Sequence, residues 1–135
     1  MLAIKDETFE GTFPFAPHYY THDGFVMHYV DEGGGEPVVM VHGDPTWGYL
    51  YRNFIPPLSR HYRCVVPDLM GMGKSDVPQD RSLYRLEQHR ANLEALLLHL
   101  DVRDITLVLH DWGGPVGLGF ATRHPERIKR LVLMN

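Results

Sequence analysis

A chain of 135 residues, 44% of them hydrophobic, is long enough for one domain with a hydrophobic core and too short for two. Its formal net charge of −4, with lysines and arginines scattered along the chain, excludes the basic surface that a nucleic-acid partner requires. The single cysteine, Cys64, excludes an internal disulfide, and we expect a cytoplasmic setting. No apolar run approaches the ~18 residues of a membrane span and no secretory signal pattern opens the chain, so we expect no membrane partner.

In the first half of the chain, short segments with the composition of strands alternate with turns. Three segments predict strands: residues 25–30, 38–41 and 62–69. Between the first two, residues 31–37 are rich in glycine and charge and predict a turn. Residues 46–59 predict a short helix that is cut by Pro56 and Pro57.

The second half predicts helix, strand, helix and strand in that order. The longest helical pattern covers residues 81–100, where leucines recur at the three-to-four spacing of one buried face: Leu86, Leu93, Leu97 and Leu100. Residues 105–109 predict a strand, a glycine-rich helix begins at Gly113 and ends near Pro125, and residues 131–134 begin another strand. This alternation predicts an α/β fold with a mostly parallel sheet flanked by helices. Ligands of such sheets bind beyond the carboxyl ends of the strands.

The segment Leu109–Gly114 follows an apolar strand and begins a helix, which is the setting of a nucleophile elbow. Asp111 occupies the position at which such elbows usually carry serine. A carboxylate is already ionised at neutral pH, so it needs no base before it attacks carbon and forms an ester. We therefore expect Asp111 to be the catalytic nucleophile.

Hydrolysis of such an ester requires an oxyanion hole and a base that activates water. The segment His42-Gly43-Asp44-Pro45 lies at the end of the preceding core strand. We expect the backbone N–H groups of Asp44 and Trp112 to form a two-donor oxyanion hole.

Four segments together resemble the haloalkane dehalogenases, which have the α/β-hydrolase fold. They are residues 24–34, 42–52, 67–76 and 110–114, and the likeness extends from about Phe15 to Asn135. The resemblance implies that Asp111 displaces halide from a hydrophobic alkyl halide, and that water then cleaves the alkyl-enzyme ester to an alcohol. It implies no cofactor and no metal.

By the same resemblance, Trp112 holds the departing halide through its indole N–H, which can only donate. At the position of Asp44, many members of the family have asparagine, whose amide donates a second hydrogen bond to the halide. An ionised aspartate cannot donate this bond. In a subgroup with an acid at this position, the second donor is a tryptophan of a cap domain that is absent from this chain.

The family's base is a histidine after the last strand, and its acid lies after the sixth or seventh strand. We therefore expect residues 1–135 to be the N-terminal portion of a single domain, truncated after the sixth strand and lacking the cap domain. His124 cannot replace the base, because a helical rise of about 1.5 Å per residue places it roughly 20 Å from Asp111. We expect the His110 ring to point into the core and His42 to fix its loop. The chain alone should form the ester slowly or not at all.

Simpler readings exist for the individual motifs. Asp111 could be a helix N-cap, and Trp112 could be a core aromatic. Gly73-Lys74-Ser75 resembles the end of a phosphate-binding loop, but that motif requires glycine five residues before Gly73, where Asp68 stands.

Three alternatives to dehalogenation remain. Epoxide hydrolases and β-lactone decarboxylases share the aspartate elbow, and Asp44 followed by Thr46-Trp47 favours dehalogenation over epoxide opening. A metal-dependent hydrolase would use His42, Asp44, His110 and Asp111. A non-catalytic fragment would need a complementing chain, or would self-associate through the apolar strand at residues 131–135.

Overall fold

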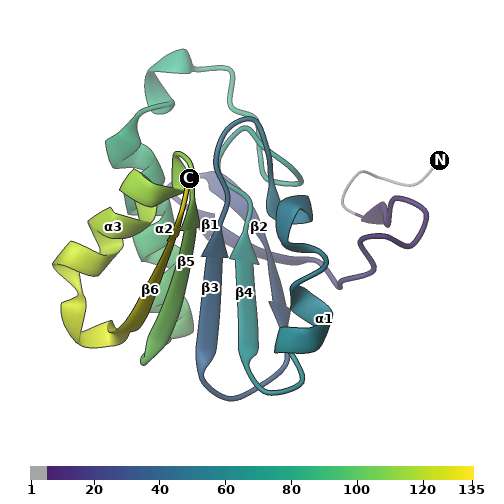
Figure 1. The fold of residues 1–135 in the computed structure, drawn as a ribbon. Helices are drawn as coiled ribbons and strands as arrows, with labels where there is room; N and C mark the ends of the chain where they lie inside the picture. The colour runs from purple at the N-terminus through teal and green to yellow at the C-terminus, as the bar shows by residue number, and fades with distance from the viewer. Residues whose placement is uncertain (1–5) are drawn as a thin grey trace.

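The computed structural model describes residues 6–135, which form a six-stranded sheet with helices on both faces (Figure 1). The strands are β1 (His18–His22), β2 (Phe25–Glu32), β3 (Pro37–Val41), β4 (Arg63–Pro67), β5 (Ile105–His110) and β6 (Ile128–Met134). They lie side by side in the order β1-β2-β4-β3-β5-β6. β3 is parallel to β4 and β5, and β5 is parallel to β6, whereas β2 is antiparallel to β1 and β4. The predicted mostly parallel sheet is confirmed.

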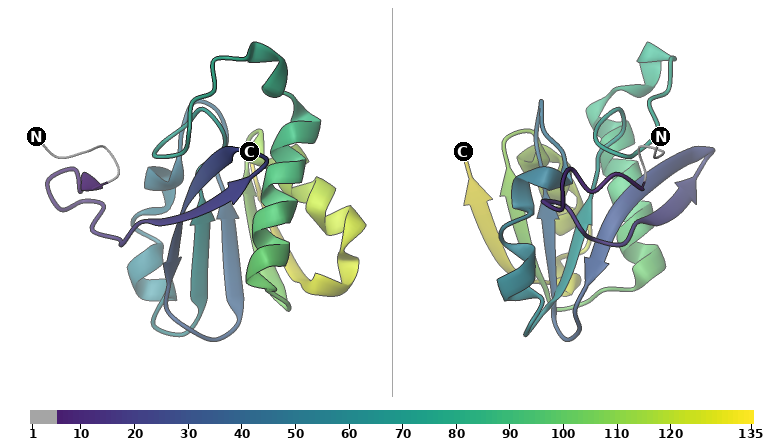
Figure 2. Two further views of the ribbon diagram at one scale, coloured as in Figure 1. Left: turned by 180° about the vertical axis from the view of Figure 1, so that it is seen from behind. Right: turned by 90° about the vertical axis from the view of Figure 1, so that its right-hand side faces the viewer.

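The sequence pattern did not predict β1. Its five residues alternate between half-buried and exposed positions, and they include two histidines and a threonine, so no apolar run marks the strand. β1 lies beside the long helix α2 (Leu86–Leu100) (Figure 2). The ring of Tyr20 stacks there on His99, with 4.3 Å between the ring centroids.

Two hydrophobic cores lie on opposite faces of the sheet, because successive side chains of a strand point to opposite sides. Val39 and Val41 of β3 pack on the face covered by α2 and α3 (Gly113–Arg123). Val38 and Met40 pack on the other face, which α1 (Ile55–Leu58) covers. Within residues 6–135, no helix combines the length and the apolar composition that crossing a membrane requires.

Two predictions about helices are wrong. The long helix begins at Leu86 rather than at residue 81, because Arg85 has an extended backbone and the side chain of Asp80 instead caps a short 3-10 turn at Arg81–Leu83. Pro56 and Pro57 do not cut a helix either. They lie in the first turn of α1, where a missing N–H costs no helical hydrogen bond.

Among residues 6–135, the last strand, β6, pairs with β5 alone, and it is longer than predicted. Its apolar side chains remain exposed at Leu131, Val132, Leu133 and Met134. An unpaired, apolar strand edge is prone to associate with another chain. Self-association of the isolated 135-residue chain remains a prediction.

A buried carboxylate joins the loops that follow β3 and β4. Asp68 is fully buried, and its Oδ1 accepts a hydrogen bond of 2.7 Å from the backbone N–H of Gly48. Its Oδ2 accepts hydrogen bonds from the backbone N–H of Lys74, at 2.9 Å, and from Nδ1 of the buried His28, at 2.8 Å. The glycine-rich segment that resembles a phosphate-binding loop is therefore folded around a carboxylate of its own chain.

Candidate active site

Asp111 lies in the turn between β5 and α3 and has a φ of 53°. A non-glycine residue adopts this left-handed conformation at a cost on the order of 1 kcal/mol. Close backbone packing surrounds the turn. A Cβ atom at Gly113 would lie 2.5 Å from the carbonyl oxygen of His42, and a Cβ atom at Gly43 would lie 2.4 Å from the Cβ atom of Asp111. Only glycine fits at either position. This explains Gly113 in the elbow and Gly43 in the loop after β3.

The carboxylate of Asp111 is exposed. Its Oδ2 accepts a hydrogen bond of 3.1 Å from the backbone N–H of Asp44, whereas Oδ1 has no partner within residues 6–135. Asp111 does not cap α3: the N-cap position belongs to Trp112, and no side chain caps this helix end. One carboxylate oxygen is thus held by the loop after β3, and the other is free to react.

The loop after β3 is fixed by His42, as the sequence predicted. The ring is fully buried; Nδ1 donates to the carbonyl oxygen of Gly43 at 2.9 Å, and Nε2 accepts from the backbone N–H of Leu69 at 2.9 Å. Burial lowers the pKa of His42, which favours this neutral form. Both ring nitrogens are therefore engaged, and neither can bind a metal ion.

Trp112 is 57% exposed, so the interpretation as a core aromatic is wrong. Its backbone N–H makes no hydrogen bond to Asp111 within the described part of the chain. Of the two predicted oxyanion donors, Asp44 therefore contacts the Asp111 carboxylate directly. The halide-binding role of the Trp112 indole remains a prediction.

A cleft of about 300 Å³ opens at the carboxyl ends of the strands, between the loop after β3, the elbow and the start of α2. Asp44, Tyr84, Arg85 and Trp112 line it together with four apolar side chains: Leu69, Met72, Leu86 and Val116. Trp112 also borders the adjoining open hollow that contains Asp111. Apolar walls with a few polar groups are typical of sites for small hydrophobic ligands.

His89 also lines this cleft, and the sequence interpretation did not single it out. Helical spacing could have indicated that His89 faces inward, because it lies three residues after Leu86 and four before Leu93, on the buried stripe of α2. Burial lowers the pKa of His89, and the nearby Asp44 carboxylate only partly offsets that effect. A neutral imidazole therefore shares the cleft with Asp44, whose backbone N–H binds the Asp111 carboxylate.

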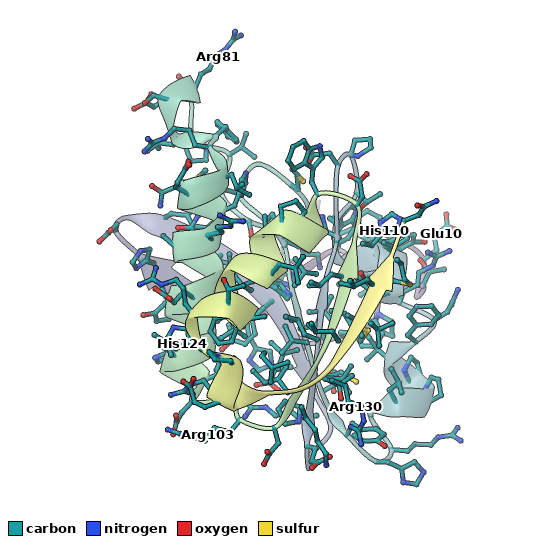
Figure 3. The ribbon with its side chains drawn as sticks, turned by 60° about the vertical axis from the view of Figure 1, so that its left-hand side comes forward. Glu10, Arg81, Arg103, His110, His124 and Arg130 are labelled. Carbon is teal, nitrogen blue, oxygen red and sulfur yellow. The ribbon has the colours of Figure 1, made fainter. Side chains whose placement is uncertain are left out.

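Two other histidines near the elbow in sequence do not join the site. His110 is half-buried rather than enclosed in the core, and it lies near the carboxyl end of β5 (Figure 3). His124 follows the opposite end of α3, where Nε2 lies 2.8 Å from a carboxylate oxygen of Glu94. Residues 6–135 contain no cluster of three histidine, cysteine or acidic side chains that could hold a metal ion.

Residues 36–135 match a family model described as alpha/beta hydrolase fold. The chain is 52% identical over 124 residues to the cis-3-alkyl-4-alkyloxetan-2-one decarboxylase of Shewanella oneidensis, covering 90% of this chain and 39% of the relative. It is 39% identical over 145 residues to the haloalkane dehalogenase of Mycolicibacterium paratuberculosis, covering 100% of this chain and 48% of that relative. The tetrameric structure of haloalkane dehalogenase DpaA from Paraglaciecola agarilytica NO2 matches with a TM-score of 0.88 and 41% identity, covering 92% of this chain and 44% of that one. The chain therefore spans less than half the length of these relatives.

Proposed function

We infer that this chain, which belongs to the α/β-hydrolase fold family, carries the nucleophile of an enzyme that bonds Asp111 to a carbon atom of its substrate. Support comes from the Asp111 carboxylate, which is exposed on a left-handed turn, with Oδ2 bound to the Asp44 N–H and Oδ1 without a partner within residues 6–135. An ionised oxygen in this position is ready to attack without a base. The Asp44 N–H keeps the carboxylate oriented while it attacks.

We propose a β-lactone with two alkyl substituents as the substrate of the whole protein. An oxetan-2-one is such a four-membered cyclic ester, and the relative with 52% identity is named as a decarboxylase of this compound class. The apolar side chains of the cleft suit alkyl substituents. Asp44 cannot itself be a second halide donor, because an ionised carboxylate cannot donate a hydrogen bond.

The proposed reaction needs no water. Asp111 attacks the saturated ring carbon that is bonded to the ring oxygen; that alkyl C–O bond breaks, and its electron pair leaves on a new carboxylate. The substrate is then an alkyl ester of Asp111. In the second step, the carbon–carbon bond to the carboxylate breaks and releases carbon dioxide, its electrons form the alkene, and the ester C–O pair returns to Asp111. No proton moves, so this route requires no catalytic base.

Cleavage of carbon–halogen bonds is the second candidate. It is favoured by the exposed Trp112, whose indole N–H can donate to a halide, and by the 41% identity to a haloalkane dehalogenase structure. In this reaction water attacks the Asp111 ester, and negative charge develops on the ester carbonyl oxygen. The Asp44 N–H would stabilise that charge. Opening of an epoxide to a diol is the third alternative.

Labelled water distinguishes these reactions. The whole protein is incubated with a cis-3,4-dialkyl β-lactone in ¹⁸O-labelled water, the products are quantified, and the peptide containing Asp111 is analysed by mass spectrometry. We expect alkene and carbon dioxide in equal amounts and no ¹⁸O in Asp111. Halide release from an alkyl halide with ¹⁸O in Asp111 would favour the second candidate. If Asp111→Asn turned over any of these substrates as fast as the wild type, the covalent function would be rejected.

A further inference from the structure

His89 combines a position in the cleft with unused hydrogen-bonding capacity. Its side chain extends from the first turns of α2 into the cleft that Asp44 and Trp112 also line. Asp44 donates its backbone N–H to the nucleophile, and Trp112 borders the hollow that contains Asp111. His89 therefore shares the cleft with two residues that contact or adjoin Asp111.

Neither ring nitrogen of His89 has a hydrogen-bond partner within residues 6–135. Nδ1 is buried, whereas Nε2 is accessible. A buried N–H without an acceptor is more costly than a buried lone pair without a donor. The tautomer with its proton on Nε2 is therefore favoured, and it directs an N–H donor toward the accessible side of the ring.

We propose that His89 contacts the substrate and donates a hydrogen bond from Nε2 to the carboxylate oxygen that leaves when Asp111 attacks. This role rests on the β-lactone function proposed above. In that reaction the ring oxygen gains negative charge as its bond to carbon breaks, so a donor on it stabilises the transition state more than the neutral ester. The Asp44 N–H cannot serve both ends of the reaction, because it is bound to Asp111 Oδ2.

The environment of His89 suits a neutral donor. Burial lowers the pKa of the ring, and this effect exceeds the opposing attraction of the Asp44 carboxylate. A neutral imidazole keeps the donor role at neutral pH, beside the charged side chains of Asp44 and Arg85 that also line the cleft. It also avoids a lasting ion pair with Asp44, which would compete with the substrate oxygen for the same proton.

Two substitutions separate hydrogen bonding from packing. His89→Phe retains a ring of similar size without a donor, whereas His89→Gln retains an N–H donor. With the whole protein and the β-lactone, we expect His89→Phe to lower kcat by about 10- to 100-fold with a small change in KM. His89→Gln should recover most of that loss, and both variants should melt within a few degrees of the wild type.

His99→Phe is the matched control, because His99 lies on the same helix and stacks on Tyr20 away from the cleft. It should retain wild-type kcat. Equal losses in His89→Phe and His89→Gln, or wild-type kcat in His89→Phe, would overturn the role of His89. A wild-type protein that does not convert the β-lactone would instead reject the proposed function, so the two failures are distinguishable.

Discussion

Two aspartates of this chain show how differently a fold can treat the same side chain. Asp68 is fully buried, and three donors engage its two oxygens: the backbone N–H groups of Gly48 and Lys74, and the ring of His28. Asp111 is exposed on a left-handed turn and, within the described part of the chain, its side chain receives one hydrogen bond, from the Asp44 N–H. The first carboxylate is saturated with donors, and the second keeps one oxygen unpaired.

The difference separates a structural role from a chemical one. A buried carboxylate is stabilised only if its lone pairs are satisfied, and the same hydrogen bonds remove its electron pairs from reaction. A nucleophile needs the opposite arrangement: one oxygen oriented by the protein and the other free. Loss of Asp68 should therefore affect folding, and loss of Asp111 should affect catalysis.

The largest effect is expected at the nucleophile. Asp111→Asn should lower turnover by the whole protein about 10⁴-fold or more, because an amide cannot form the ester. The free energy of unfolding should change by less than about 0.5 kcal/mol, since asparagine also tolerates the left-handed conformation. Asp104→Asn is the matched control, because Asp104 is an exposed aspartate with a φ of 56°. If Asp111→Asn remained as active as Asp104→Asn, Asp111 would not be the nucleophile.

The buried aspartate should show the reverse profile. Asp68→Ala leaves the His28 ring and two backbone N–H groups without an acceptor, and we expect the free energy of unfolding to fall by about 3–5 kcal/mol. Asp68→Asn retains one acceptor oxygen and should lose less. Urea denaturation measures both variants. A loss below about 1 kcal/mol in Asp68→Ala would mean that the network contributes little.

A smaller effect is expected at Gly43, where the loop after β3 approaches Asp111 in the elbow. Gly43→Ala places a Cβ atom 2.4 Å from the Cβ atom of Asp111, so the nucleophile must move. We expect turnover to fall about 10- to 100-fold and the free energy of unfolding to fall by about 1–3 kcal/mol. Gly34→Ala, where a Cβ atom meets nothing within 4 Å, should change neither quantity. Equal behaviour of the two variants would show that the close approach does not constrain the site.

The smallest effect concerns pH. The pKa of His42 is lowered by burial, so the folded protein binds fewer protons than the unfolded chain below the ordinary pKa of 6.5. The contribution of neutral His42 is complete above that pH and is lost as the pH falls, by at most about 1.4 kcal/mol per pH unit. Urea denaturation from about pH 8 to 5 measures the slope. His42→Gln keeps an acceptor for Leu69 and should flatten it; an unchanged slope would assign the titration to other groups.

Much of the fold was predictable because its strands carry apolar runs and its glycines mark turns. The α/β-hydrolase fold and the resemblance to haloalkane dehalogenases are confirmed by the family match and by the relatives. Strand β1 was not predictable in this way, because its side chains are polar and only half-buried. The start of α2 was misplaced because Asp80 caps a separate short turn before Arg85.

The site was predictable where the backbone dictates the residue. Asp111 and Asp44 lie in the loops that follow two strands; Gly113 follows from a close approach to the backbone of Val41 and His42, and Gly43 from a close approach to the side chain of Asp111. His89 and Asp68 were missed as members of the arrangement, because their roles depend on tertiary contacts between segments far apart in the sequence. Dehalogenation, epoxide opening and lactone decarboxylation share one nucleophile, so the elbow alone does not choose between them.

The most direct measurement is the mass of the peptide that contains Asp111 after the whole protein is mixed with a β-lactone and quenched in acid within milliseconds. We predict an added mass equal to the entire substrate on Asp111, because ring opening retains every atom until carbon dioxide leaves. The adduct should be absent from Asp111→Asn. Rapid turnover with no adduct on Asp111, or with the added mass on another residue, would contradict the account.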